Sequence, residues 1–334
     1  MTLPAGAVVD AHVHLLGVDR DDHGCFFSPR MRSRISTRAV LSIVGARVSD
    51  PPSVVDRRYL DHLVAELDAS PSVDRVVLLP LDGVYGADGR LDEARTGVLV
   101  PNAFVEESCR AHPRLVPACS VNPLRADAIA ELGRAAAAGA VLCKWIPATM
   151  GFDPADPRCA PFYARLRELD MPILSHVGTE FALPTVSAPL GALGRLDAAL
   201  DAGVRVIVPH AGSLRFLGDA ADWRALVAEI GRRPGLWIDD SALLMVHRRR
   251  RLFRLLETPE VHARTIHGSD FPLPAQPLAF ADRLGLRRAR ALRRVRGAFE
   301  RDLVLKRELG LPDSILSNAT RVLRGVSPPR STPP

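Results

Sequence analysis

The stretch Asp10-Ala11-His12-Val13-His14 stands at the end of the first apolar run of the chain. Side chains two positions apart on an extended strand point to the same face, so the His12 and His14 imidazoles project together. Their backbones lie about 6–7 Å apart at the usual rise of a strand, which lets both rings reach one metal ion. Neutral imidazoles suit zinc and its neighbours better than calcium or magnesium. The pair therefore predicts a metal site at a strand end.

The composition of the 334-residue chain is that of a globular protein, with 47% hydrophobic and 25% charged residues. No apolar run is long enough to cross a bilayer, and no amino-terminal secretion signal is recognisable. The five cysteines are scattered, which argues against a disulfide framework and a cysteine-based zinc site. We therefore expect a cytoplasmic protein with no membrane partner and with buried or half-buried thiols.

The net charge of +6 comes largely from late arginines, in residues 248–251 and 287–296. Such blocks can attract nucleic acid or acidic surfaces. No recognition motif accompanies them, and aromatic residues make up only 5% of the chain. A solvated helix face is the simpler interpretation, so we expect no nucleic-acid partner. A contact between subunits, or attraction of an anionic substrate, stays open.

Short apolar runs alternate with longer stretches rich in Ala, Leu and Arg. Val-, Ile- and Leu-rich runs between helical patterns are typical of parallel strands buried on both faces. Eight such runs predict an α/β fold, a closed (β/α)8 TIM barrel. An open doubly wound sheet is the alternative, but no glycine-rich phosphate turn follows the first strand. The predicted strands are residues 7–14, 73–81, 115–121, 140–146, 172–176, 204–210, 236–239 and 265–269. The predicted helices are residues 54–68, 102–112, 125–138, 160–169, 190–201, 223–232 and 243–256.

Two long loops interrupt this rhythm after strands 1 and 2, at residues 15–52 and 82–101. We expect both to lie over the barrel mouth, where barrel enzymes place substrate contacts. Residues 1–326 are interpreted as a single barrel domain. Residues 327–334 contain four prolines and are expected to be a disordered tail.

Polar residues also stand at the ends of four later strands, at Lys144, His176, His210 and Asp270. The first three are 32 and 34 residues apart, about one βα unit each, and the 60 residues to Asp270 fit two units. The candidates thus belong to strands 1, 4, 5, 6 and 8 at the catalytic end of a barrel. One polar strand end is commonly structural, but five in register predict a shared site.

This pattern resembles the amidohydrolase superfamily of metal-dependent (β/α)8 hydrolases. Within it, the chain is similar to the amidohydrolase-related group that includes aminocarboxymuconate-semialdehyde decarboxylase. The resemblance spans residues 8–322 and rests on the motif at 10–14 and on Gly-Ser-Asp-Phe-Pro at 268–272, with His-Ala-Gly at 210–212 in support.

The resemblance implies that His12, His14, His176 and Asp270 bind metal, and that Asp270 is also the general base for the metal-bound water. It implies that His210 is either a ligand of a second metal or a hydrogen-bonding acid near the substrate. A divalent cation lowers the pKa of bound water toward 7 and polarises the carbonyl under attack. Zinc is the expected metal, as one ion or two.

Lys144 decides between subtypes. An ammonium beside a dication would be repelled, so Lys144 must be neutral, displaced or chemically converted. The resemblance implies that a lysine at the end of strand 4 is carbamylated and bridges two metals in binuclear members. Related decarboxylases use one metal and usually lack this lysine. In a mononuclear site, Lys144 would instead stay an ammonium and bind a substrate carboxylate or phosphate.

Loop residues close to the ligand positions are candidate substrate contacts, namely His23, Glu180 and Arg215. Asp240, after strand 7, could help to shape the site. His267, three residues before Asp270, should face the helices and be structural.

We therefore predict a hydrolase that uses metal-activated water on a small ester, lactone or amide, with a small-molecule substrate as its partner. The alternative enzyme is a mononuclear zinc nonoxidative decarboxylase of a small aromatic or unsaturated carboxylic acid. The alternative of another class is an inactive barrel or a protein that binds through its basic surface. A homodimer would suit the resemblance, although no residue pattern requires one.

Overall fold

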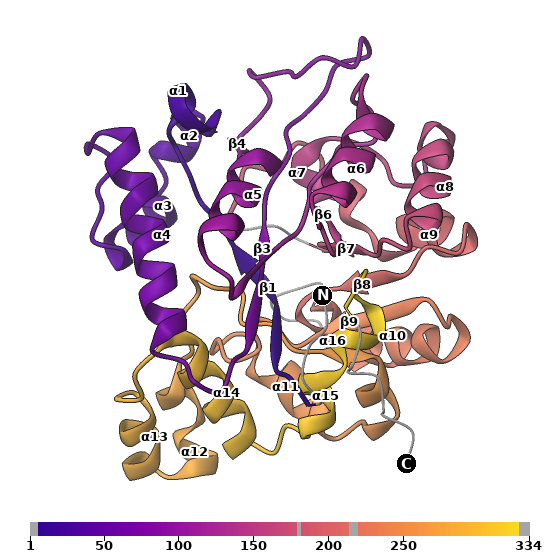
Figure 1. Cartoon of the computed structure of the whole chain (residues 1–334). Helices are drawn as coiled ribbons and strands as arrows, with labels where there is room; N and C mark the ends of the chain where they lie inside the picture. The colour runs from indigo at the N-terminus through magenta and orange to yellow at the C-terminus, as the bar shows by residue number, and fades with distance from the viewer. Residues whose placement is uncertain (1–5, 179–181, 214–219, 327–334) are drawn as a thin grey trace, which may run out of the picture.

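The protein is described by a computed structural model that covers residues 6–178, 182–213 and 220–326. In this part of the chain, parallel strands alternate with helices (Figure 1). One sheet has the order β1-β3-β5 and a second has the order β10-β9-β8-β7-β6. The strands of these sheets are β1 (Val9–His14), β3 (Arg75–Leu79), β5 (Leu115–Pro117), β6 (Cys143–Trp145), β7 (Ile173–Ser175), β8 (Val206–Val208), β9 (Leu236–Asp239) and β10 (Thr265–Ile266).

Both edges of the two sheets are joined by parallel contacts. On one side, Cys119 bridges to Cys143, so β5 continues into β6. On the other side, Val13 bridges to Phe271, and the Ala11 amide donates to the His267 carbonyl over 2.9 Å. The predicted TIM barrel is confirmed; β9 has its predicted bounds, and the other strands are shorter than their apolar runs because the outer residues of each run leave the ladder.

The helices surround the strands (Figure 1). The longer ones are α3 (Ile35–Ile43), α4 (Pro52–Asp68), α5 (Asn102–Ala111), α6 (Ala128–Ala137), α8 (Ala160–Glu168), α10 (Ala220–Arg232), α11 (Arg249–Leu256) and α14 (Ala298–Glu308). The shorter ones are α1 (Arg20–His23), α2 (Pro29–Arg32), α7 (Pro147–Met150), α9 (Asp197–Asp201), α12 (Ala281–Leu284), α13 (Leu286–Leu292), α15 (Asp313–Ser317) and α16 (Ala319–Val322). The 3-10 segments are η1 (Pro157–Cys159), η2 (Ala188–Gly191), η3 (Leu193–Leu196), η4 (His210–Gly212), η5 (Pro259–Arg264) and η6 (Pro277–Phe280).

Two helix predictions were wrong in extent. The helix predicted at 190–201 is two 3-10 turns followed by the short α9, because glycines at 191 and 194 weaken its first half. The helix predicted at 243–256 begins at Arg249, after a turn that starts at Ala242 with a φ of 54°. Beyond residue 256 only an arginine-rich helix face at 287–296 was predicted, whereas α12 to α16 lie between Ala281 and Val322.

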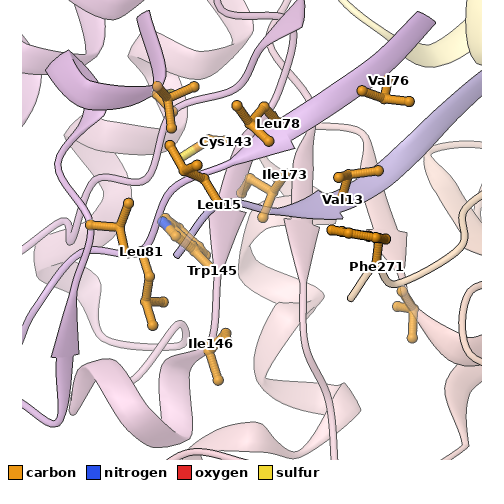
Figure 2. Close-up of a cluster of buried hydrophobic side chains, with 14 of the residues drawn as sticks. Val13, Leu15, Val76, Leu78, Leu81, Cys143, Trp145, Ile146, Ile173 and Phe271 are labelled. Atoms are coloured by element: carbon orange, nitrogen blue, oxygen red, sulfur yellow. The ribbon is translucent and has the colours of Figure 1, made fainter. Parts of the chain in front are cut away.

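Hydrophobic side chains of the strands divide between an inner and an outer cluster. The inner cluster contains Ala11, Leu174 and Ile207, and residues of the carboxyl-terminal α16 join it. The outer cluster packs the strands against the helices and includes Val13 and Trp145 (Figure 2). The Trp145 ring contacts Phe152 with the ring centroids 4.9 Å apart, and Phe162 with the centroids 5.5 Å apart. Core packing thus determines which side chains of each strand point into the barrel and which point toward the helices.

The two long loops contact each other. Strand β2 (Phe26–Phe27) of the first loop pairs antiparallel with β4 (Val98–Leu99) of the second. The prediction that both loops lie on one side of the barrel is therefore confirmed. Residues 327–334, expected to be disordered, lie outside the described residues.

The surface and the thiols largely follow the sequence. All five cysteines are free, and four of them are buried. Within the described ranges, no helix combines the length and the apolar character needed to span a membrane. The arginine-rich face is only partly solvated, since Arg251 is buried with its guanidinium over the Trp223 ring, 5.1 Å from the centroid. The other arginines include pairs such as Arg249–Asp282.

Candidate metal centre

The first strand turns its two histidines into the site through an irregularity in its ladder. Asp10 pairs with Val76 and Val13 pairs with Leu78, so three residue steps on β1 face two on β3. Such a bulge re-aims the side chains that follow it. Ala11 lies in the inner cluster and Val13 in the outer one, which leaves His12 and His14 on the inner side. The Tyr59 hydroxyl donates to the His14 carbonyl over 2.7 Å and fixes this strand end.

His12, His14 and Asp270 form a group of ligand atoms with metal-site spacing. The Nε2 atoms of the two histidines are 3.2 Å apart. Asp270 Oδ1 lies 3.4 Å from His12 Nε2 and 3.3 Å from His14 Nε2. Tetrahedral ligands at about 2.0–2.1 Å from zinc are separated by about 3.3 Å. The three donors therefore fit one zinc-sized ion without rearrangement.

A buried carboxylate sets the orientation of His12. The Nδ1–H of His12 donates to Asp239 Oδ2 over 2.8 Å, which leaves the lone pair on Nε2 toward the metal group. Asp239 ends β9 and is completely buried. Burial raises the pKa of Asp239, against hydrogen bonds from Ser241 and the His210 amide that lower it. This carboxylate-histidine pairing is typical of metal ligands.

Ser241 connects His210 to the same carboxylate. His210 Nδ1 lies 2.8 Å from Ser241 Oγ, whose hydroxyl donates to Asp239 Oδ1. The His210 amide also donates to Asp239 Oδ1, over 2.8 Å. His210 has a φ of 58°, a left-handed conformation that a non-glycine residue keeps only when its surroundings fix it. The chain therefore holds His210 firmly, with Nε2 available to a ligand or a substrate.

Lys144 and His176 complete the constellation. Lys144 is 1% exposed, and its Nζ lies 3.2 Å from His12 Nε2. The His176 ring meets the His210 ring edge-on at 5.3 Å between centroids, and His210 stacks on His12 at 5.4 Å. All six residues predicted to bind metal thus lie in one cluster at the strand ends, and all but the half-buried His14 are buried. His12, His14 and Asp270 already have ligand spacing, whereas Lys144, His176 and His210 adjoin them.

The electrostatics of the cluster favour metal-binding forms of its side chains. Burial, with the charge of Lys144 next, holds the pKa of His12 well below its ordinary value. Burial, with Arg248 next, does the same for the pKa of His210. Burial would raise the pKa of Asp270, but His12 and His14 lower it to about 2. Near pH 7 the cluster therefore offers neutral His12 and His210 imidazoles and an ionised Asp270 carboxylate.

Of the three candidate substrate contacts, His23 lies in the described part of the chain. The His23 Nδ1 atom is 3.0 Å from Asp56 Oδ2, and its ring stacks on Phe104 with centroids 4.0 Å apart. These contacts hold His23 of the first loop against α4 and α5. Glu180 and Arg215 lie outside the described residues.

Asp239, rather than Asp240, contacts the site. Neighbouring residues of a strand point to opposite faces, and Asp240 faces the helices together with His267 and Lys306. The prediction that His267 faces the helices is confirmed. Sequence reasoning missed Asp239, although the alternation that placed His12 and His14 together could have selected it, and it missed Ser241.

The fold and the cluster together define a metal-binding type of (β/α)8 barrel. The family model described as Amidohydrolase matches residues 9–306, and the chain belongs to this family of enzymes, which includes hydrolases and decarboxylases. No curated protein is significantly similar in sequence.

Solved structures share the fold at low sequence identity. An uncharacterized TIM-barrel protein from Bordetella bronchiseptica is 17% identical with a TM-score of 0.54, over 90% of this chain and 99% of that one. A probable 2-pyrone-4,6-dicarboxylic acid hydrolase from Acinetobacter baumannii is 16% identical with a TM-score of 0.53, over 94% and 98%. The 5-carboxyvanillate decarboxylase of Sphingomonas paucimobilis is 13% identical with a TM-score of 0.51, over 95% and 98%. These likenesses support the barrel and do not select a reaction.

Proposed function

We propose that the protein is a metal-dependent hydrolase of a small ester, lactone or amide, with Lys144 carbamylated and two zinc ions in the cluster. The observation that carries this proposal is the position of Lys144, buried with its Nζ 3.2 Å from a ligand atom of the metal group. An ammonium there would oppose a dication strongly in a low-dielectric interior. Carbamylation replaces the cation by an anionic group with two oxygens and removes the conflict.

Most residues of the cluster would bind the metal ions, and Asp270 would also transfer a proton. His12, His14 and Asp270 would hold one ion, and carbamylated Lys144 with His176 and His210 would hold the second. Bound divalent ions supply Lewis acidity and acidify water at the site. Asp270 is ionised near pH 7, so its carboxylate can accept a proton and return it to the leaving group.

The metal group is open to solvent on one side. His14 has 25% of its side chain exposed, whereas His12 has 1% exposed, so solvent and substrate approach from the His14 side. The two long loops, joined by β2 and β4, flank the barrel mouth and would select the substrate. The free cysteines suit a cytoplasmic enzyme.

A mononuclear decarboxylase is the second candidate. Among the residues that the structure describes, the group with ligand atoms all within 4.8 Å of one another contains His12, His14 and Asp270 alone. With one ion there, Lys144 would remain an ammonium and bind the carboxylate of the substrate. The decarboxylase hypothesis therefore requires the Lys144 side chain to move away from His12 when the metal binds.

Metal content and lysine chemistry separate the two candidates. We expect two zinc ions per chain and, after exchange with 13C-bicarbonate, a carbamate carbon signal in the NMR spectrum. The Lys144→Arg variant cannot form this carbamate and is the control. One zinc ion, no carbamate signal and turnover of aromatic acids rather than lactones or aryl esters would replace the hydrolase by the decarboxylase.

A further inference from the structure

A buried cluster lies on the helix side of the metal centre, behind the turn 268–271 that carries Asp270. We propose that Lys306 of α14 is a positioning residue for Asp270, acting through the peptide group of Gly268. The inference rests on the proposed function in one respect, because it takes Asp270 as a metal ligand.

The turn is anchored at every backbone amide from Gly268 to Phe271. Gly268 N donates to Asp240 Oδ1 and Ser269 N to Asp10 Oδ1, each over 2.9 Å. Asp270 N donates to the His12 carbonyl over 2.9 Å, and Phe271 N to Ser269 Oγ over 3.1 Å. The turn is therefore fixed in position relative to β1 and to the end of β9.

Asp10 couples the turn to the first pair of ligands. Its Oδ1 atom accepts the amide of Ser269 and, over 3.1 Å, the amide of His12. One carboxylate oxygen therefore binds both β1, which carries His12 and His14, and the turn 268–271, which carries Asp270. A displacement of the turn would change the spacing of Asp270 from His12.

Asp270 needs these hydrogen bonds because its backbone conformation is energetically unfavourable. Its φ is 66°, in the left-handed region that few non-glycine residues adopt. Such conformations cost on the order of 1–3 kcal/mol and persist only where the surrounding structure fixes them. The conformation brings the Asp270 carboxylate to the histidines.

Lys306 is connected to both backbone polar groups of Gly268, to the carbonyl directly and to the amide through Asp240. Its Nζ donates to the Gly268 carbonyl over 2.7 Å and to Asp240 Oδ1 over 3.0 Å, the same oxygen that accepts the Gly268 amide. A further ion pair joins Nζ to Asp302 Oδ1, one helical turn earlier, at 2.7 Å. Lys306 is completely buried. Burial alone would lower its pKa, but Asp240 and Asp302 raise it above the ordinary value, so the lysine stays charged.

Asp302 provides the matched control. It contacts the Lys306 ammonium, whereas no hydrogen bond of the described residues connects its side chain to the turn. Removing Lys306 alone would leave two buried carboxylates without their cation and could unfold the chain. The double variant Lys306→Met/Asp302→Asn removes one charge of each sign, and it is compared with Asp302→Asn.

Two measurements at pH 7.5 test the proposal. In metal-free protein, we expect hydrogen exchange at residues 268–271 to be at least tenfold faster in the double variant than in Asp302→Asn. In zinc titrations against a chromophoric chelator, we expect the affinity of the double variant to be about 10–100-fold weaker, the usual effect of losing an outer-shell partner. The zinc affinity of Asp302→Asn should stay within about threefold of that of the wild type, because within the described residues Asp302 contacts neither a metal ligand nor the turn that carries Asp270.

Equal zinc affinity in the double variant and in Asp302→Asn would overturn the positioning role. If the wild type binds no zinc under replete conditions, the proposed metal chemistry fails, and hydrogen exchange alone then decides on Lys306. Faster exchange at 268–271 in the double variant would retain the role, and unchanged exchange would remove it.

Discussion

The hydrogen bond between His12 and Asp239 gives the most direct test of the metal centre. Asp239 is completely buried, and its Oδ2 atom lies 2.8 Å from His12 Nδ1. In Asp239→Asn, the amide can donate a hydrogen bond to Nδ1, which moves the ring proton to Nε2. The ligand lone pair of His12 is then lost from the metal group, while the volume of the side chain is unchanged.

We expect this substitution to weaken zinc binding about 10–100-fold, or about 1.4–2.7 kcal/mol. The chelator competition assay at pH 7.5 measures the affinity, and circular dichroism establishes that the variant is folded. His210 should also be affected, since its amide and Ser241 both donate to the other oxygen of Asp239.

The control is a second buried pair of the same kind. Asp56 is 1% exposed and accepts from His23 over 3.0 Å, and neither residue belongs to the group of His12, His14 and Asp270. Asp56→Asn should lower the melting temperature and leave zinc affinity unchanged. Wild-type affinity in Asp239→Asn, or an equal loss in both variants, would refute the assigned orientation of His12.

Three further predictions concern the same region. His12→Ala and Asp270→Asn should abolish turnover and stoichiometric zinc binding in a folded barrel, as metal analysis and circular dichroism would show; full activity in either would remove the site. Gly268→Ala should reduce zinc affinity as well as the melting temperature, because the new Cβ would lie 2.7 Å from His12 Cβ and 3.2 Å from Ser241 Cβ. Asp302 gives a pH prediction, since burial raises its pKa from 3.8 to about 6. Between these values the folded state binds more protons than the unfolded state, so the stability contributed by this group falls as pH rises. Denaturant unfolding should show the wild type losing on the order of 2 kcal/mol relative to Asp302→Asn between pH 4 and 6. A flat difference would contradict that shift.

Sequence periodicity predicted the barrel because each strand is a compact apolar run and each polar strand end recurs at the length of a βα unit. The same register brought Lys144, His176, His210 and Asp270 to the first histidine pair. The bulge in β1 was not predictable, because it depends on the pairing of Asp10 and Val13 with β3.

Partners of the ligands were harder to predict than the ligands. Asp239 and Ser241 are adjacent to residues that face the helices, and only tertiary packing shows which side chain reaches His12. Lys306 comes from a carboxyl-terminal helix that the sequence analysis did not define. Its role depends on contacts across 38 residues to Gly268. The two long loops lie on one side of the barrel as predicted, while the substrate contacts Glu180 and Arg215 stay predictions.

The short antiparallel pairing of Phe26–Phe27 with Val98–Leu99 couples the conformations of the two loops. Each strand is only two residues long, so neither would persist without the other. An insertion or exchange in one loop must therefore be compatible with the strand of the other loop. Attempts to redesign substrate choice should transfer both loops together.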